Sequence, residues 1–270
     1  MTIAFLGGGN MARALIGGLV GMGYDRASIS AIEVSPAARG RLASEHGVHA
    51  SAAPDARTSA AGILVLAVKP QDMKTALKSV TGEIGGKLVI SIAAGVRVDA
   101  LSRWLGGHRK LVRCMPNTPS LIGAGIAALY AVPEVNAAER QVAETILRAV
   151  GDVVWVEDER LLDPVTALSA SGPAYVFWFI EQLAASGEKL GLDKQIASKL
   201  AMQMVLGAAK LAAQSADPPG ELRRQVTSKG GTTEAALKVF EQERLAEKIM
   251  KALEAASRRG AELGDELGKG

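Results

Sequence analysis

Short apolar runs alternate with amphipathic stretches over the first half of the chain. The runs are rich in Val, Ile and Leu, and they span residues 2–6, 29–33, 63–69, 87–95, 110–117 and 153–157. Strands that are apolar on both faces are typical of a parallel sheet covered by helices on both sides. Capping residues mark two of the helices, with Pro36 and Gly47 at the ends of one and Asn136 and Gly151 at the ends of the other.

From about residue 161 onward only helical patterns remain. They span residues 172–191, 193–215, 220–228, 232–243 and 245–260, and turn residues rich in Gly and Pro separate most of them. The junction is expected at 158–172, and the last residues, 264–270, are expected to fray. We therefore predict an α/β protein, with an N-terminal Rossmann-type doubly wound sheet over residues 1–160 and an all-α dimerisation domain over residues 161–270.

Two helices of the second half are apolar nearly all round. Residues 174–180 contain no polar position, and residues 200–213 contain only Gln203 and Lys210. A helix that is apolar on most faces must be buried on most faces. A homodimer or a larger homo-oligomer would provide that burial, although packing against the first domain is an alternative.

Charge and cysteine content narrow the function classes. The net charge is +3, but the basic residues are dispersed, so we expect no nucleic-acid partner. Cys114, the one cysteine, lies in an apolar run and is expected in the core. The three histidines show no metal-ligand spacing and are expected at the surface or in loops, so no metal is predicted.

The longest uninterrupted apolar runs are too short to span a bilayer, which favours a cytoplasmic protein without a membrane partner.

A glycine-rich loop follows the first strand and opens a helix. Gly7, Gly9 and Ala12 fit the G-x-G-x-x-G/A pattern of dinucleotide-binding proteins. The first glycine permits a tight turn, the second lets the backbone approach a pyrophosphate, and Ala12 allows close packing of helix on strand. We expect cofactor contacts from Gly7, Gly8, Gly9, Asn10 and Met11, since amides at a helix start face phosphates.

Other cofactor contacts are expected where the following strands end. Glu33 would accept hydrogen bonds from ribose hydroxyls and repel the 2′-phosphate of NADPH, although a solvated strand-end glutamate is an alternative. Ser35, Arg39 and Arg41 could still suit a phosphate. In an open α/β sheet, ligands lie at the carboxyl ends of the strands. Further candidates are therefore Val68, Lys69, Pro70, Ala93, Ala94 and Asn117, of which Asn117 could equally be a turn former.

A second glycine-rich stretch, VTSKGGTTEAAL over residues 226–237, precedes a helix without a strand before it. Gly230 and Gly231 allow a close backbone approach, and Ser228, Thr232 and Thr233 add hydroxyl groups. Amides at a helix start suit an anion. An ordinary helix N-cap is the alternative interpretation.

Six motifs together resemble the pyrroline-5-carboxylate reductase family. They are FLGGGNMARAL, LAVKPQDM, SIAAG, RCMPNTP, SASGPAYVF and VTSKGGTTEAAL, which occur in the family's order over nearly the whole chain. The resemblance implies NADPH- or NADH-dependent reduction of (S)-1-pyrroline-5-carboxylate to L-proline, the last step of proline biosynthesis. It places Ser228, Gly231, Thr232 and Thr233 around the substrate, with the Thr233 hydroxyl near the imine nitrogen. Gly230 and Asn117 are further candidates for substrate contacts.

One departure from the family concerns the cofactor. Members that favour NADPH often have an Asn-Arg type pair after the second strand, where this chain has Glu33 and Val34. The family default is NADPH, whereas the charge of Glu33 favours NADH.

Rival functions are another cyclic imine reductase, a β-hydroxyacid dehydrogenase, and a non-catalytic dinucleotide sensor. The lysine that such dehydrogenases use is missing from residues 172–186, and a sensor would need no carboxylate cradle.

Overall fold

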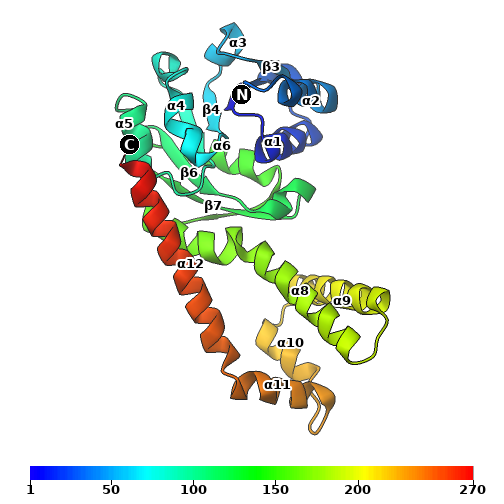
Figure 1. The fold of residues 1–270 in the computed structure, drawn as a ribbon. Helices are drawn as coiled ribbons and strands as arrows, with labels where there is room; N and C mark the ends of the chain where they lie inside the picture. Colours follow the sequence, from blue (N-terminus) through cyan, green and yellow to red (C-terminus); the bar gives the residue numbers. More distant parts are fainter. Residues whose placement is uncertain (270) are drawn as a thin grey trace. The chain divides into compact units, whose positions relative to one another are not determined.

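A computed structural model describes residues 1–269 of the chain, and its first part is an eight-stranded sheet (Figure 1). The strands are β1 (Ile3–Leu6), β2 (Ile29–Ile32), β3 (His49–Ser51), β4 (Ile63–Leu66), β5 (Leu88–Ser91), β6 (Leu111–Met115), β7 (Gly125–Ala131) and β8 (Gly151–Trp155). Their order in the sheet is β3-β2-β1-β4-β5-β6-β7-β8. The predicted Rossmann-type sheet is confirmed, and its order reverses between β1 and β4, where such sheets bind ligands.

Helices accompany the sheet in the first part and make up the second part. The α-helices are α1 (Asn10–Gly21), α2 (Pro36–His46), α3 (Ala56–Ser59), α4 (Met73–Leu77), α5 (Val98–Trp104), α6 (Ala137–Arg148), α7 (Leu162–Val165), α8 (Gly172–Lys189), α9 (Lys194–Gln214), α10 (Pro219–Gln225), α11 (Thr232–Gln242) and α12 (Leu245–Gly268). Within the described residues, the longest helices are α8, α9 and α12.

The alternation of side chains along the strands creates two separate cores. On one face, Ile3 and Phe5 of β1 pack in a cluster with α1 and α6 residues such as Leu15. On the other face, Leu6 packs in a cluster with Met73 of α4 and with α5. Because successive strand side chains point to opposite faces, four-residue strands that are entirely buried need helices on both sides.

Two strands are absent from the sequence prediction. β3 has only three residues, all half-buried, and β7 pairs antiparallel with β6, so that β7 and β8 run against the other six strands. His49, expected at the surface or in a loop, lies in β3, and its Nε2 is 2.5 Å from an Asp55 carboxylate oxygen. Hydrogen bonds from the backbone amide of Thr58 and from the His49 side chain lower the pKa of Asp55 to about 2.

The capping predictions are confirmed at three of four helix ends. Pro36 occupies the first turn of α2 and Gly47 ends it with φ +68°. Asn136 caps α6 in a reciprocal capping box with Glu139. Gly151, expected to close the same helix, instead begins β8, because α6 ends at Arg148.

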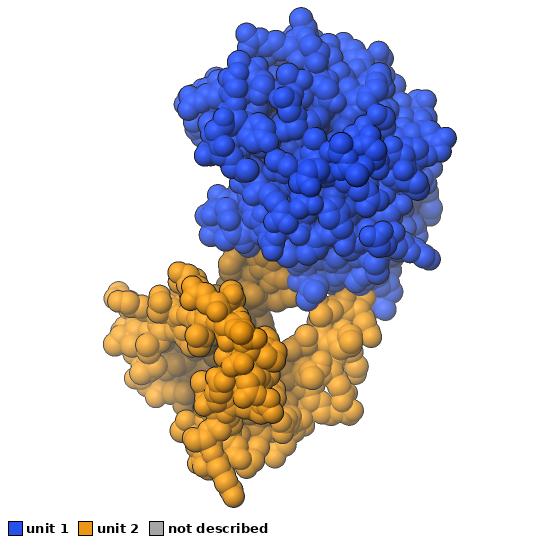
Figure 2. All heavy atoms as spheres, turned by 180° about the vertical axis from the view of Figure 1, so that it is seen from behind, with its two compact units in different colours: residues 1–171, 255–270 blue, residues 172–254 orange. Residues whose placement is uncertain are grey.

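The chain forms two compact units, coloured separately in Figure 2. One contains residues 1–171 and 255–270, and the other contains residues 172–254. The helix α12 therefore begins in the second unit and ends in the first. Its residues 264–268 are helical, so the expected fraying of 264–270 is wrong over this part, while Gly270 lies outside the described residues. The division into a dinucleotide-binding domain over residues 1–160 and a helical substrate-binding and dimerisation domain over residues 161–270 stays a prediction.

Within the second unit, α8 and α9 form an antiparallel pair that meets at small residues. A Cβ placed on Gly187 of α8 would lie 3.1 Å from the Cβ of Ala197 of α9, so the two backbones approach closely. The large apolar side chains of both helices remain exposed in the single chain. They are Tyr175, Val176, Phe177, Trp178 and Phe179 on α8, with Ile196, Leu200, Met202, Met204, Leu206 and Leu211 on α9. These side chains need a covering surface.

The helix α9, at Lys194–Gln214, is long and apolar enough to cross a membrane by length and composition alone. The apolar runs considered in the sequence were shorter, because Gln203 and Lys210 interrupt the pattern. The expectation that the protein has no membrane partner stays a prediction.

Candidate active site

The glycine-rich loop lies where the strand order of the sheet reverses. Gly7 has φ +100°, and a Cβ there would lie 2.8 Å from the carbonyl carbon of Ala67, just past the end of β4. Only glycine tolerates both the positive φ and this close contact. By contrast, no heavy atom lies within 4 Å of the position that a Cβ on Gly9 would take. This open space at the start of α1 fits the close approach of a pyrophosphate, and Ala12 is buried as predicted.

The Glu33 carboxylate is held against the glycine loop. One oxygen accepts a 2.7 Å hydrogen bond from the amide of Gly8, and the other accepts a 2.7 Å bond from the amide of Ser35. The Arg39 guanidinium donates to the main-chain oxygens of Glu33 and Val34 at 2.6 and 2.9 Å. The Glu33 carboxylate is therefore held in place at the end of β2 although its side chain is only half-buried, and its role at the ribose stays a prediction.

The next two strands of the sheet end in short turns. After β4, Val68 packs at the edge of the second core, and Lys69 and Pro70 open a 3-10 turn. After β5, the amide of Ala93 donates a 3.4 Å hydrogen bond to the Ser91 hydroxyl, and Ala94 is half-buried. Both turns lie at the carboxyl edge of the sheet, on the same side as the glycine loop.

Asn117 follows β6 and makes hydrogen bonds through both ends of its side-chain amide. Its oxygen accepts a 3.0 Å bond from the amide of Ile126, at the edge of β7. Its nitrogen lies 3.4 Å from the Ser169 hydroxyl oxygen, in the π-helical turn Thr166–Ala170. The side chain ties the loop after β6 to β7 and to the junction before α8, and it makes no capping hydrogen bond in the 3-10 turn that follows it. Its part in ligand binding stays a prediction.

The second glycine-rich stretch forms the N-terminus of α11. Gly231 is the N-cap, and Gly230 has φ +73°. The amide of Gly231 bonds to the Ser228 main-chain oxygen at 3.0 Å. The first helical amides, those of Thr232 and Thr233, have no intrahelical partner and point out of the helix start. This geometry fits an anion, with hydroxyl groups on either side.

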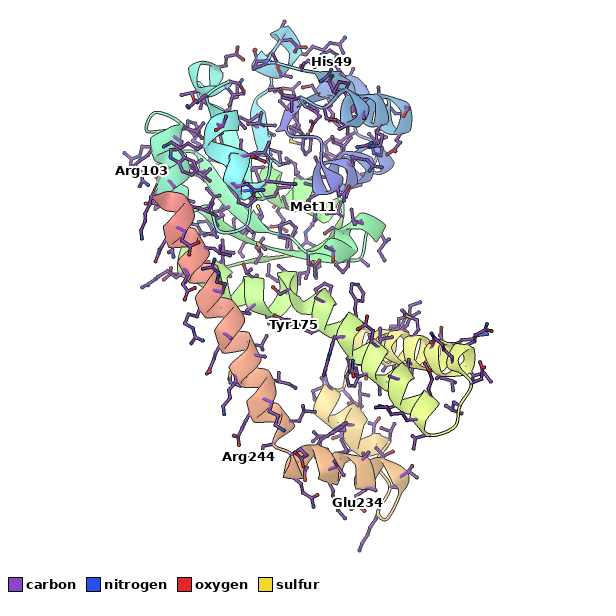
Figure 3. The ribbon with its side chains drawn as sticks, viewed as in Figure 1. Met11, His49, Arg103, Tyr175, Glu234 and Arg244 are labelled. Atoms are coloured by element: carbon purple, nitrogen blue, oxygen red, sulfur yellow. The ribbon has the colours of Figure 1, made fainter. Side chains whose placement is uncertain are left out.

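The sequence prediction missed Glu234, which belongs to the same loop (labelled in Figure 3). Its carboxylate reaches back to accept a 2.7 Å hydrogen bond from the amide of Gly230. Glu234 is the third residue of α11, the position from which a Glu bonds the N-cap amide in a capping box, but here it bonds Gly230, one residue before the N-cap. One of the loop's amides is thus already satisfied by the protein itself.

Cys114 does not contribute to this chemistry. The side chain is buried in the first core, and burial raises the pKa of the thiol far above its usual range. The expectation of a core residue is confirmed. At neutral pH the group is a neutral thiol, which is a poor nucleophile.

Known proteins resemble this chain over its whole length. Residues 159–263 match the family described as pyrroline-5-carboxylate reductase dimerisation, and residues 2–95 match the family described as NADP oxidoreductase, coenzyme F420-dependent. A pyrroline-5-carboxylate reductase of Pseudomonas aeruginosa is 44% identical over 268 residues, which cover 99% of this chain and 98% of that protein. The chain belongs to the pyrroline-5-carboxylate reductase family.

Solved structures of the same family agree with the fold. A pyrroline-5-carboxylate reductase from Coxiella burnetii is 42% identical, with a TM-score of 0.93 and coverage of 97% of this chain and 98% of that one. A Plasmodium falciparum pyrroline carboxylate reductase with NADP bound is 28% identical, with a TM-score of 0.84 and 98% coverage of both chains. The predicted family, fold class and NAD(P)H-dependent oxidoreductase activity are confirmed, and the dimerisation match indicates a homo-oligomer.

Proposed function

We propose that this chain reduces (S)-1-pyrroline-5-carboxylate to L-proline with NADPH or NADH, and that the charge of Glu33 favours NADH. The observation that carries the substrate assignment is the start of α11, where glycines, outward amides and hydroxyls converge. A small cyclic imine with a carboxylate offers the anion that such a site would bind. Curated relatives of 40–44% identity over nearly the full chain bear the name of this activity, which supports the proposal.

The substrate carboxylate is proposed to bind at residues 228–233. The amides of Thr232 and Thr233 and the positive end of the α11 dipole supply donors and charge. Gly230 and Gly231 let the backbone come close, and the Ser228 hydroxyl adds a donor. Asn117 is proposed as a further contact to the substrate. Glu234 holds the turn through the amide of Gly230, so the cradle is formed before the substrate arrives.

The cofactor is proposed to lie along the carboxyl edge of the sheet. The open position at Gly9, the positive φ of Gly7 and the carboxylate of Glu33 fit its pyrophosphate and ribose. When bound, the reduced nicotinamide supplies the hydride. The residues that we propose to contact the cofactor are Gly7, Gly8, Gly9, Asn10, Met11, Glu33, Ser35, Val68, Lys69, Pro70, Ala93, Ala94 and Asn117.

The protein's share of the chemistry is mainly positioning. A protonated imine is already electrophilic, so the enzyme needs to hold its carbon within about 3–3.5 Å of the hydride donor. The Thr233 hydroxyl is proposed to hydrogen-bond the imine nitrogen and to orient its proton. Neither a histidine nor a reactive cysteine is needed for such a step, and the carboxylate at α11 serves as the handle.

The exposed apolar faces of α8 and α9 are proposed to form a homodimer interface. Trp178 and Phe177 are 61% and 60% exposed in the single chain, which is unusual for side chains of this size. A second copy of the same surface would bury them. A cytoplasmic location is part of the same proposal.

The direct test is a turnover assay across several cyclic imines with NADH and NADPH. We expect absorbance of the reduced cofactor to decay with 1-pyrroline-5-carboxylate and far more slowly with an uncharged pyrroline that lacks the carboxylate. A reaction without imine serves as the control. Equal rates with the charged and uncharged rings would exclude the carboxylate cradle and with it the proposed substrate.

Replacing the catalytic hydroxyl should slow the reaction without stopping it. We expect Thr233→Ala to lower kcat about ten- to a hundredfold, because one transition-state hydrogen bond is worth roughly 1–3 kcal/mol. Thr233→Ser should recover most of the rate. Thr145→Ala, in which an exposed hydroxyl on α6 is removed, is the matched control. An unchanged kcat for Thr233→Ala would remove Thr233 from the mechanism.

A further inference from the structure

The C-terminal end of α12 lies against the loop that follows β5, and both belong to the first unit. A Cβ on Gly264 would lie 2.9 Å from Arg97 Nε and 3.2 Å from the main-chain oxygen of Gly95. Gly95 has φ +74°, and a Cβ there would lie 3.2 Å from the Cδ1 of Leu267. The helix and the loop therefore meet backbone to backbone, and a larger side chain at Gly264 would force them apart.

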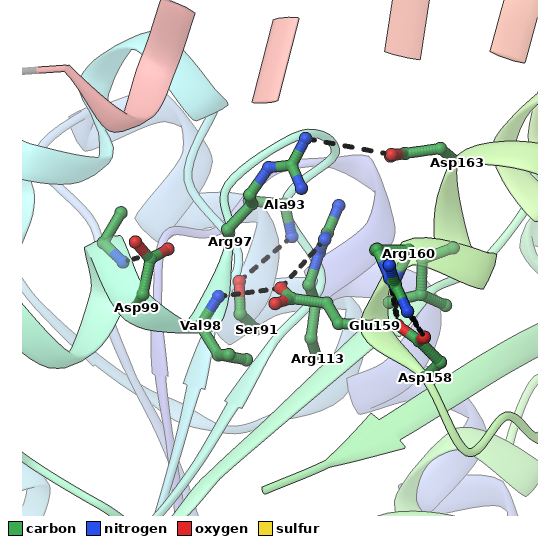
Figure 4. Close-up of polar contacts among 12 residues, drawn as sticks. Ser91, Ala93, Arg97, Val98, Asp99, Arg113, Asp158, Glu159, Arg160 and Asp163 are labelled. Atoms are coloured by element: carbon green, nitrogen blue, oxygen red, sulfur yellow. Dashed lines mark hydrogen bonds and ion pairs between the residues drawn. The ribbon is translucent and has the colours of Figure 1, made fainter. Parts of the chain in front are cut away.

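Arg97 fastens this contact. Its Nη2 lies 3.1 Å from an Asp265 carboxylate oxygen and donates a 3.3 Å hydrogen bond to the Ala261 carbonyl, both on α12. The same nitrogen is 3.9 Å from Asp163 of α7, the ion pair drawn in Figure 4. Its Nε is buried without a hydrogen-bond partner among the described residues. The guanidinium of Arg97, two residues after Gly95 in the chain, thus interacts with both α12 and α7.

The other side of the loop is fixed by a buried ion pair. The Glu159 carboxylate accepts a 2.8 Å hydrogen bond from the amide of Val98, the first residue of α5, and a 3.0 Å bond from Arg113 (Figure 4). Residues 93–98 are therefore held between α12 on one side and a buried carboxylate on the other.

A cavity separates α12 from the strand ends. It has a volume of about 330 Å³ and is mostly apolar. Its walls include Pro70, Ala94, Gly95, Thr166, Leu263 and Leu267. The helix thus forms one wall of a space whose other walls are the turns after β4 and β5.

From these contacts we infer that Arg97 and Gly264 are positioning residues for the cofactor. The C-terminal turns of α12 hold the loop Ala93–Gly95 in the conformation that accepts the nicotinamide half. This inference rests on the proposed function, which assigns Ala93 and Ala94 to the cofactor. Neither Arg97 nor Gly264 needs to touch the cofactor, because both act through the backbone of the loop.

The test measures NADH binding without any imine, by quenching of the cofactor's fluorescence. We expect the dissociation constant to rise roughly tenfold in Arg97→Met and in Gly264→Val, since a small displacement of a binding loop has effects of at least that order. Arg97→Lys keeps the charge for Asp265 and should recover part of the affinity. The KM for the imine at saturating NADH should change less than twofold.

Arg259→Met is the matched control, because Arg259 lies on the same helix but pairs with Glu262 and Glu266 on the exposed surface. Circular dichroism at the assay temperature selects the variants that are folded, and Gly264→Ala replaces Gly264→Val if the latter unfolds. The inference is overturned if folded Arg97→Met binds NADH as tightly as the wild type, or if Arg259→Met weakens binding equally. Wild-type protein that binds NADH but leaves the imine unreduced would instead refute the proposed function alone.

Discussion

Glu33→Gln is expected to shift the cofactor preference from NADH toward NADPH by roughly ten- to a hundredfold in the ratio of kcat/KM values. The carboxylate is fixed by the amides of Gly8 and Ser35 and cannot turn away from an incoming 2′-phosphate. Two like charges about 4 Å apart repel by roughly 1 kcal/mol in bulk water and by roughly 4 kcal/mol at an effective dielectric constant of 20. The Glu33 side chain is half-buried, so we expect an intermediate repulsion of about 1.4–2.7 kcal/mol, and 1.36 kcal/mol corresponds to a factor of ten.

The glutamine side chain keeps an oxygen that can accept one of the hydrogen bonds from these backbone amides. The substitution therefore changes the charge of the side chain more than its shape. It also leaves the Arg39 guanidinium beside the site, where it can pair with a phosphate. The measurement is a pair of saturation curves, one for each cofactor, on the wild type and the variant.

Glu45→Gln is the matched control for this experiment. Glu45 is on α2 and pairs with Arg13 at the surface, away from the amide of Gly8. We expect the ratio of kcat/KM values for NADH and NADPH in this variant to equal that of the wild type. A wild-type enzyme that strongly prefers NADPH, or a ratio that Glu33→Gln leaves unchanged, would contradict the role given to Glu33.

Glu159→Ala is expected to destabilise the first unit by about 3–5 kcal/mol, because it leaves a buried cation without its carboxylate. Arg113 is 3% exposed, and Glu159 is its ion-pair partner within residues 1–269. The same substitution removes the acceptor for the amide of Val98 at the start of α5. Glu159→Gln, which keeps an acceptor oxygen, should cost less than Glu159→Ala.

Urea unfolding followed by circular dichroism provides the measurement. All variants must be compared at one protomer concentration, because the stability of an oligomer depends on it. Glu262→Ala removes the same side chain from an exposed pair with Arg259 and should cost at most about 1 kcal/mol. A loss for Glu159→Ala no larger than that of Glu262→Ala would show that the buried pair contributes little to stability.

Local sequence patterns determined most of the first unit. Strands such as Ile3–Leu6 are apolar at every position, which requires helices on both faces and so a parallel sheet. Gly7 and Gly9 mark the dinucleotide loop because the backbone geometry there leaves no alternative residue at Gly7 and open space at Gly9. The N-cap at Asn136 could also be predicted from the sequence, because a capping box involves two residues that are only three positions apart.

Contacts between distant residues decided the rest. The strand β7 was missed because its place beside β6 depends on pairing across the sheet, and Gly151 opens a strand because Gly125 lies directly against it. The helical residues 264–268 look weak in isolation, and they are ordered by their contact with Gly95 and Arg97.

The chain's sequence therefore determined its family, six of the eight strands and the two glycine-rich loops, because each of these is encoded in neighbouring residues. Only the tertiary structure decided that Glu33 bonds the glycine loop and that Arg97 fastens α12 to the end of β5. Partners that lie 25 and 168 residues apart leave no periodicity or spacing in the sequence, since folding alone brings their side chains within hydrogen-bonding distance.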